Sequence, residues 1–92
     1  MKGLIIGGHE NWQRKMKELL PGFKFILPDA LNFDVSILEG VEGIFVYTNY
    51  LNHGMYYKLI NEVRKKDLPL HYLSYNVNEN IVLQQIAQLS KK

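Results

Sequence analysis

Two short polar segments carry the residue types that could bind a ligand. The first is Gly7-Gly8-His9-Glu10, and the second runs from Thr48 to His53 and includes Asn49 and Tyr50. Two glycines let a backbone turn sharply and present its N–H groups. A helix that follows such a turn adds N–H donors and the positive end of its dipole, which favours a phosphate or carboxylate. The glycines could equally serve the turn alone, so both interpretations stay open.

Two of the three histidines, His9 and His53, occur in these segments. A neutral imidazole can donate or accept a hydrogen bond, act as a base, or bind a metal. Two histidines alone make an incomplete metal site, and Glu10 and Tyr50 are the nearest further ligands. The sequence therefore favours hydrogen bonding to a small anionic or phosphorylated ligand. A metal or haem site built on His9 and His53 is the alternative, and a structural role for both is the third interpretation.

The chain offers little for catalysis. It has no cysteine, which excludes thiolate metal sites and cysteine nucleophiles. No serine stands in a nucleophile elbow, and neither a Walker phosphate loop nor a complete G-x-G-x-x-G pattern occurs. We therefore predict no catalytic residue and no particular cofactor, and we favour a binding module over an enzyme.

Strand and helix patterns alternate along the chain. Apolar runs predict strands at 4–6, 23–27, 43–47 and 68–73, and helical patterns span about 12–20, 53–66 and 78–89. Residues 31–38 could be a short helix or irregular. In the first helix we expect Trp12, Met16, Leu19 and Leu20 to face the core and Gln13 to face solvent. This alternation predicts a Rossmann-like three-layer α/β domain, with four parallel strands in the order 2-1-3-4.

That strand order would unite the two polar segments. Ligands of open parallel sheets bind at the carboxyl ends of the strands, where the winding direction reverses. Here the reversal falls between the first and third strands, which would lie about 4.8 Å apart. The predicted ligand site therefore comprises Gly7, Gly8, His9, Glu10, Thr48, Asn49, Tyr50 and His53.

Four tyrosines, at positions 47, 50, 56 and 57, surround the second segment. They could stack on a flat ligand, form a dimer surface, or pack in the core. We expect at least two of them, Tyr47 among these, to pack in the core.

Length and charge limit the remaining possibilities. The 92 residues allow one domain, 1–92, whose modest core favours a homodimer. The net charge of +2 comes largely from Arg64-Lys65-Lys66 and Lys91-Lys92, which we expect at solvated helix ends. No aromatic residue interleaves with these runs, so we expect no nucleic-acid partner. No apolar stretch is long enough to span a membrane, and we expect a cytoplasmic protein.

The chain resembles the bacterial family known as domain of unknown function 2325. The resemblance covers nearly the whole chain and depends on Leu4–His9, Thr48, His53, a lysine at 65 or 66, and Pro69. It implies a small Rossmann-like domain, usually cytoplasmic and without an agreed activity, with motif positions at Gly7, Gly8, His9, Thr48 and His53. This chain departs from the pattern at 74–78, where a glycine is missing.

Overall fold

The computed structural model describes residues 2–27, 33–47, 51, 53–73 and 78–90, with the side chains of 79, 89 and 90 left undescribed. The described chain alternates strands with helices, as the sequence predicts. In chain order the elements are β1 (Gly3–Ile6), α1 (Glu10–Leu19), β2 (Lys24–Ile26), the 3-10 helix η1 (Val35–Leu38), β3 (Gly43–Tyr47), α2 (His53–Lys66), β4 (Leu70–Leu73) and α3 (Glu79–Ser90).

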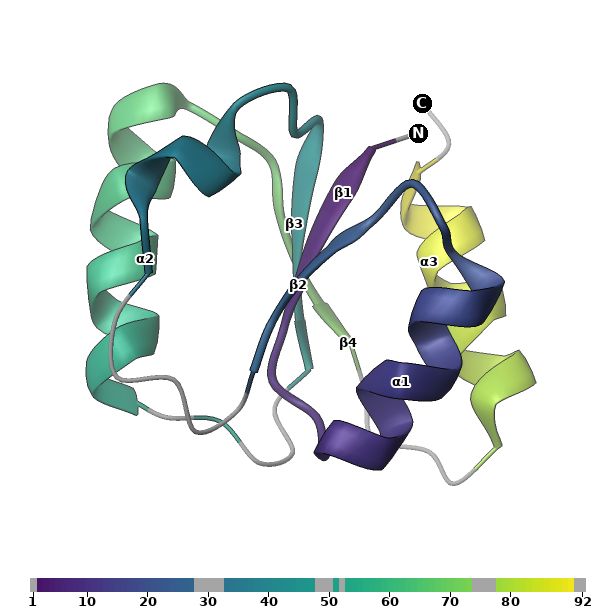
Figure 1. The fold of residues 1–92 in the computed structure, drawn as a ribbon. Coiled ribbons are helices and arrows are strands. Elements are labelled where there is room, and N and C mark those ends of the chain that lie inside the picture. Colours follow the sequence, from purple (N-terminus) through teal and green to yellow (C-terminus); the bar gives the residue numbers. More distant parts are fainter. Residues whose placement is uncertain (1, 28–32, 48–50, 52, 74–77, 91–92) are drawn as a thin grey trace.

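The four strands form one parallel sheet in the order β2-β1-β3-β4, which confirms the predicted fold class and strand order. The register aligns Ile5 with Phe45 and Ile6 with Val46, so β1 and β3 end side by side. Helices α1 and α3 cover one face of the sheet, while α2 and η1 cover the other (Figure 1). The winding direction thus reverses between β1 and β3.

Each face of the sheet has its own apolar core because successive strand residues point to opposite sides. Leu4 and Ile6 of β1 point to the face covered by α2 and share a core cluster with Leu59 and Val63 of that helix. Ile5 packs on the other side, in a cluster completed by the buried side chains Met16, Phe45, Tyr47, Leu73, Val82 and Ile86. The central strands β1 and β3 are buried along their whole length, as crossovers on both faces require.

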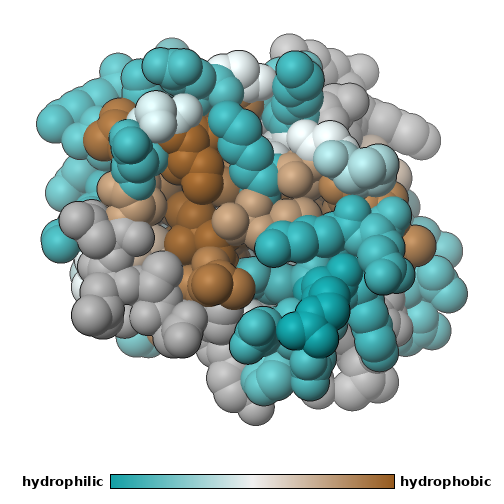
Figure 2. Space-filling model, viewed as in Figure 1, coloured by the Kyte–Doolittle hydropathy of each residue, from teal (hydrophilic) through white to brown (hydrophobic). Residues whose placement is uncertain are grey.

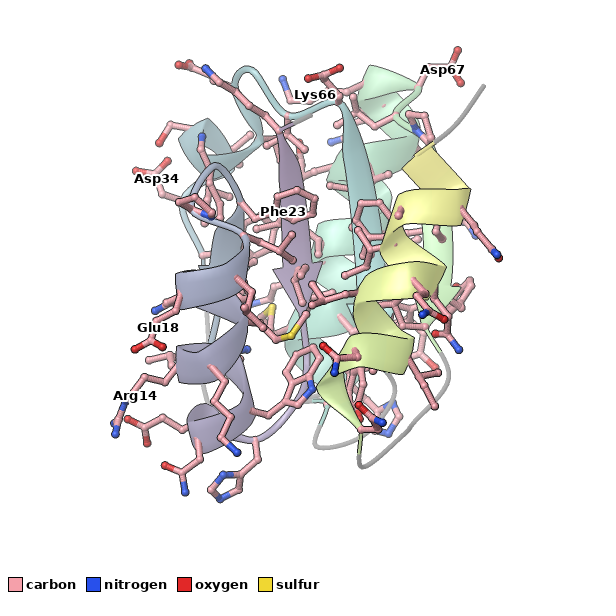
Figure 3. All side chains as sticks on the ribbon, turned by 90° about the vertical axis from the view of Figure 1, so that its right-hand side faces the viewer. Arg14, Glu18, Phe23, Asp34, Lys66 and Asp67 are labelled. Atoms are coloured by element: carbon pink, nitrogen blue, oxygen red, sulfur yellow. The ribbon has the colours of Figure 1, made fainter. Side chains whose placement is uncertain are left out.

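The Phe23 ring packs closely against Gly3, the first residue of β1. A Cβ at Gly3 would stand 2.6 Å from the Phe23 ring. Only glycine, which has no side chain, fits at position 3 without a shift of that ring. Figure 3 shows the labelled Phe23 over β1, in the space between α1 and α3. The α1-side core therefore extends to the amino end of the sheet.

The buried face of α1 differs from the predicted one. Gln13 is buried, with 1% of its surface exposed, whereas Leu19 is 51% exposed. The prediction that Gln13 faces solvent and Leu19 faces the core was therefore wrong. The inward stripe instead passes through Gln13, Met16 and Leu20, because the Gln13 amide finds hydrogen-bond acceptors at the strand ends.

The basic run at the end of α2 lies where the sequence predicts it. Arg64, Lys65 and Lys66 occupy the last turn and are exposed, and there they complement the helix dipole. Asp67, with φ +54°, ends the helix. Lys91-Lys92 lie outside the described residues. In the described part of the chain, no helix is both long enough and apolar enough to cross a membrane.

Candidate functional site

The first polar segment forms the turn that joins β1 to α1. Gly7 and Gly8 have φ values of +94° and +85°, a conformation that only glycine adopts readily. Both are buried. The ring of Trp12 lies against Gly8 so closely that a Cβ there would overlap it. The glycines therefore have a structural role in this turn.

Gln13 ties this turn to the end of β2, and sequence reasoning missed its role. Its Nε2 donates hydrogen bonds to the carbonyl oxygens of Gly7, at 2.8 Å, and Ile26, at 2.6 Å. Two carbonyl acceptors fix the orientation of the amide, since a flipped amide would turn its oxygen toward them. The Gln13 Oε1 is buried and has no hydrogen-bond partner among the described residues. The carboxyl ends of β1 and β2 are thus held together by one side chain.

His9 is the N-cap of α1. Its Nδ1 accepts a hydrogen bond of 3.2 Å from the backbone N–H of Asn11, and the residue is exposed. An accepting Nδ1 carries no proton, so the neutral ring has its proton on Nε2. In this state Nε2 is a donor suited to an anion. Ligation of a metal through Nε2 would require the proton to move to Nδ1, which would break the cap.

Glu10 begins α1 and is exposed. Its carboxylate forms an ion pair with Arg14 at 3.6 Å, one helical turn further along. Figure 3 shows the labelled Arg14 on the outer side of α1. The guanidinium reduces the repulsion that the Glu10 carboxylate would exert on an anion at the turn.

The second polar segment is described only in part. Thr48, Asn49 and Tyr50, which we predicted to contribute to the site, lie outside the described residues, as does Asn52. His53 is the first residue of α2 and is exposed. Figure 1 shows α1, α2 and α3 all beginning at the edge of the sheet where the strands end. His9 and His53 therefore belong to this one edge, where three positive helix ends also lie.

Trp12 and Tyr47 form an aromatic pair on the α1 side of the sheet, beside the ends of β1 and β3. Their ring centroids are 4.1 Å apart with an interplanar angle of 32°. Tyr47 ends β3 and is buried, and Tyr56 is half-buried against the core, which confirms that two of the four tyrosines pack inward. The Trp12 Nε1 is buried without a hydrogen-bond partner in the described part of the chain.

The described residues offer no ready metal centre. No group of three or more histidine, cysteine, aspartate or glutamate side chains occurs among them. The metal or haem alternative therefore stays a prediction, and it would need ligands from outside the described residues.

Two hollows lined by described residues lie away from the strand ends. One, of about 290 Å³, lies between the end of α1 and α3, beside Pro21 and Ile86. The other, of about 280 Å³, lies between α2 and the segment that holds Phe33 and Val35. Neither includes a predicted site residue.

Comparison with known proteins finds no relative of this chain. No known protein family matches the chain, and neither a curated protein nor a solved structure is similar to it. The resemblance to domain of unknown function 2325 stays a prediction from the residues quoted above, and the function is argued from the chain itself.

Proposed function

We propose that this domain is a binding module for a small anionic or phosphorylated ligand, held at the carboxyl edge of the sheet between the ends of β1 and β3. The observation that carries the proposal is the reversal of winding there. β1 and β3 are neighbours, and their following helices cover opposite faces. In open parallel sheets this arrangement leaves a crevice that side chains of neither helix fill.

The chemistry at this edge favours a negative charge. The N-terminal ends of α1 and α2 supply partial positive charge, and the Gly7-Gly8 turn allows close approach to the backbone. His9 presents a donating Nε2 while its Nδ1 caps the helix. His53 is exposed at the start of α2 and is a second candidate contact. The anion itself can satisfy first-turn N–H groups that water otherwise solvates.

The emission of Trp12 gives a direct binding assay because it is the only tryptophan of the chain and lies against Gly8. We expect phosphate, sugar phosphates or nucleotides to change its emission saturably. A ligand at ten times its Kd adds about 1.4 kcal/mol of stability, which corresponds to a rise in Tm of roughly 5–10 °C. Sodium chloride at matched ionic strength is the control. The proposal fails if no anion of this panel gives either response.

His9→Asp separates the two roles of His9. Aspartate is a good N-cap, so the variant should keep its fold, whereas its negative charge should repel the anion and abolish the response. His53→Ala should weaken binding at least severalfold. His71→Asn is the matched control, since His71 lies in β4, stacks on Phe45 of β3 and belongs to neither polar segment. Equal binding by all three variants would contradict the proposed site.

We also propose that the domain is a homodimer, as its small core suggests. Figure 2 shows hydrophobic side chains gathered on the side of the molecule where β2 lies nearest the viewer. Among the exposed apolar residues, Leu27 follows β2 and Val35 begins η1, with 45% and 43% of their surfaces exposed. Light scattering with size-exclusion chromatography should give twice the monomer mass of 10.8 kDa. A monomer mass at every protein concentration over a roughly 100-fold range would refute the dimer.

A further inference from the structure

Three tyrosines meet where the first half of α2 faces β4. The hydroxyl groups of Tyr56 and Tyr72 are in hydrogen-bond contact, and the rings of Tyr56 and Tyr57 are 5.6 Å apart. Tyr57 is 64% exposed and Tyr72 is 56% exposed, while Tyr56 packs partly into the core. Two large aromatic rings are therefore available at the surface, held in place by the third.

Positive charge lies beside these rings. Tyr57 and Arg64 are seven residues apart on α2, so they share one side of the helix, about 10 Å apart along its axis. The helix holds a single carboxylate, Glu62, which pairs with Lys65 at 3.3 Å, and Asp67 follows its end. Its basic residues are Lys58, Arg64, Lys65 and Lys66.

The charge selects among possible occupants of this tyrosine–arginine surface, defined by Tyr56, Tyr57, Arg64 and Tyr72. A second copy docked about a two-fold axis would place the basic helix against itself. Tyrosine and arginine are enriched in protein interfaces although lysine is depleted there, so an acidic protein segment is the competing occupant, and binding of poly-glutamate tests for it. A polyanion that carries flat rings would use both features, because its phosphates meet the cations and its bases stack on the exposed tyrosines.

We propose that the tyrosine–arginine surface binds single-stranded nucleic acid, with two or three nucleotides along α2, bases on Tyr57 and Tyr72, and phosphates beside Arg64 and Lys65. This proposal is independent of the anion site at the strand ends. The chain alone gave no such signal, because no aromatic residue interleaves with positions 64–66. The fold supplies the aromatic partner by placing Tyr72 of β4 next to α2.

Fluorescence anisotropy of a labelled dT12 oligonucleotide at low salt tests the proposal. Wild-type protein should bind saturably and more tightly than it binds a hairpin duplex, whose bases are stacked inside. Tyr57→Gln and Tyr72→Thr should each raise Kd roughly fivefold or more, whereas Tyr57→Phe, which keeps the ring, should bind like wild type. Arg64→Ala should also reduce the slope of log Kd against log salt by about 0.7.

Lys17→Ala is the matched control, because it removes one positive charge from an exposed position in the last turn of α1, away from both proposed sites. It should leave dT12 binding unchanged, and a thermal melt of each variant checks that the fold is kept. Equal losses from Lys17→Ala and Arg64→Ala, with no loss from the tyrosine variants, would show attraction by net charge only and overturn the proposal. Tighter binding of poly-glutamate than of dT12, or no binding of dT12, would overturn it as well.

Discussion

The indole of Trp12 occupies the space that a side chain at Gly8 would fill, so the turn after β1 and the first turn of α1 fit together only with glycine at that position. Trp12 also packs against the ring of Tyr47 at the end of β3. One aromatic side chain thus connects the turn after β1 to the end of the neighbouring strand. A change at Gly8 or Trp12 should therefore affect how the ends of β1 and β3 pack on the α1 side of the sheet.

Gly8→Ala should destabilise the domain more than Gly40→Ala. Both glycines have positive φ, +85° and +73°, so each alanine costs about 1–2 kcal/mol for the backbone conformation. Only Gly8 has a neighbour in the way, since a Cβ at Gly40 meets nothing within 4 Å. Urea unfolding measures both variants. Equal losses of stability would contradict the observed packing of Trp12 on Gly8.

Gln13→Met should cost roughly 2–4 kcal/mol of unfolding free energy, because the carbonyls of Gly7 and Ile26 would both lose their shared donor. Gln84→Met, at an exposed position of α3, is the control and should change stability by less than about 0.5 kcal/mol. In Gln13→Glu the carboxyl can donate only when protonated. That variant should therefore be more stable in mild acid than at neutral pH, and the reverse order would contradict the clamp.

Replacement of the N-cap tests how His9 holds α1. His9→Ala removes the acceptor of the Asn11 N–H and should cost about 1 kcal/mol, whereas His9→Asp should restore most of that loss. Thermal denaturation near neutral pH provides the measurement. If His9→Ala were as stable as the parent, the Nδ1 hydrogen bond would contribute nothing to the helix.

Tyr56 should make stability fall at high pH. Burial, and secondly the hydrogen bond with Tyr72, raise the pKa of Tyr56 to about 12, whereas an unfolded tyrosine ionises near 10. The contribution is therefore fully present below pH 10 and is lost as the pH rises toward 12, because the unfolded chain releases the proton first. Titration of tyrosinate absorbance should show one group ionising late, and Tyr72→Phe should lower its pKa. A pKa near 10 in the parent would contradict the contact.

The fold could be predicted because its main signals are local. Alternating apolar runs and amphipathic stretches determine the order of elements, and short right-handed crossovers leave few arrangements of four parallel strands. The predicted bounds of β3 and α2 agree with the observed ones, since Gly43 and the basic run 64–66 mark them clearly. Residues 31–38 stayed ambiguous because their apolar positions fit several patterns, and part of them forms η1.

The details of the site depended on tertiary partners that no local pattern contains. Gln13 looked like a solvent-facing residue, although its spacing of three from Met16 was a signal that it shares the inward stripe. Its burial follows from two carbonyls supplied by β1 and β2. His9 was predicted as a ligand contact, and its cap on Asn11 became evident only with the helix in place. The pairing of Tyr72 with Tyr56 likewise needs the sheet to bring β4 beside α2.

The most direct test of the proposed anion site is a titration of the ¹⁵N-labelled protein with phosphate or the tightest anion of the panel, followed by amide NMR shifts. We expect saturable shifts to concentrate at the turn after β1, from Gly7 to Asn11, and at the start of α2 near His53. Shifts confined to the tyrosine–arginine surface, or spread evenly over the exposed lysines, would contradict a ligand site at the carboxyl edge of the sheet.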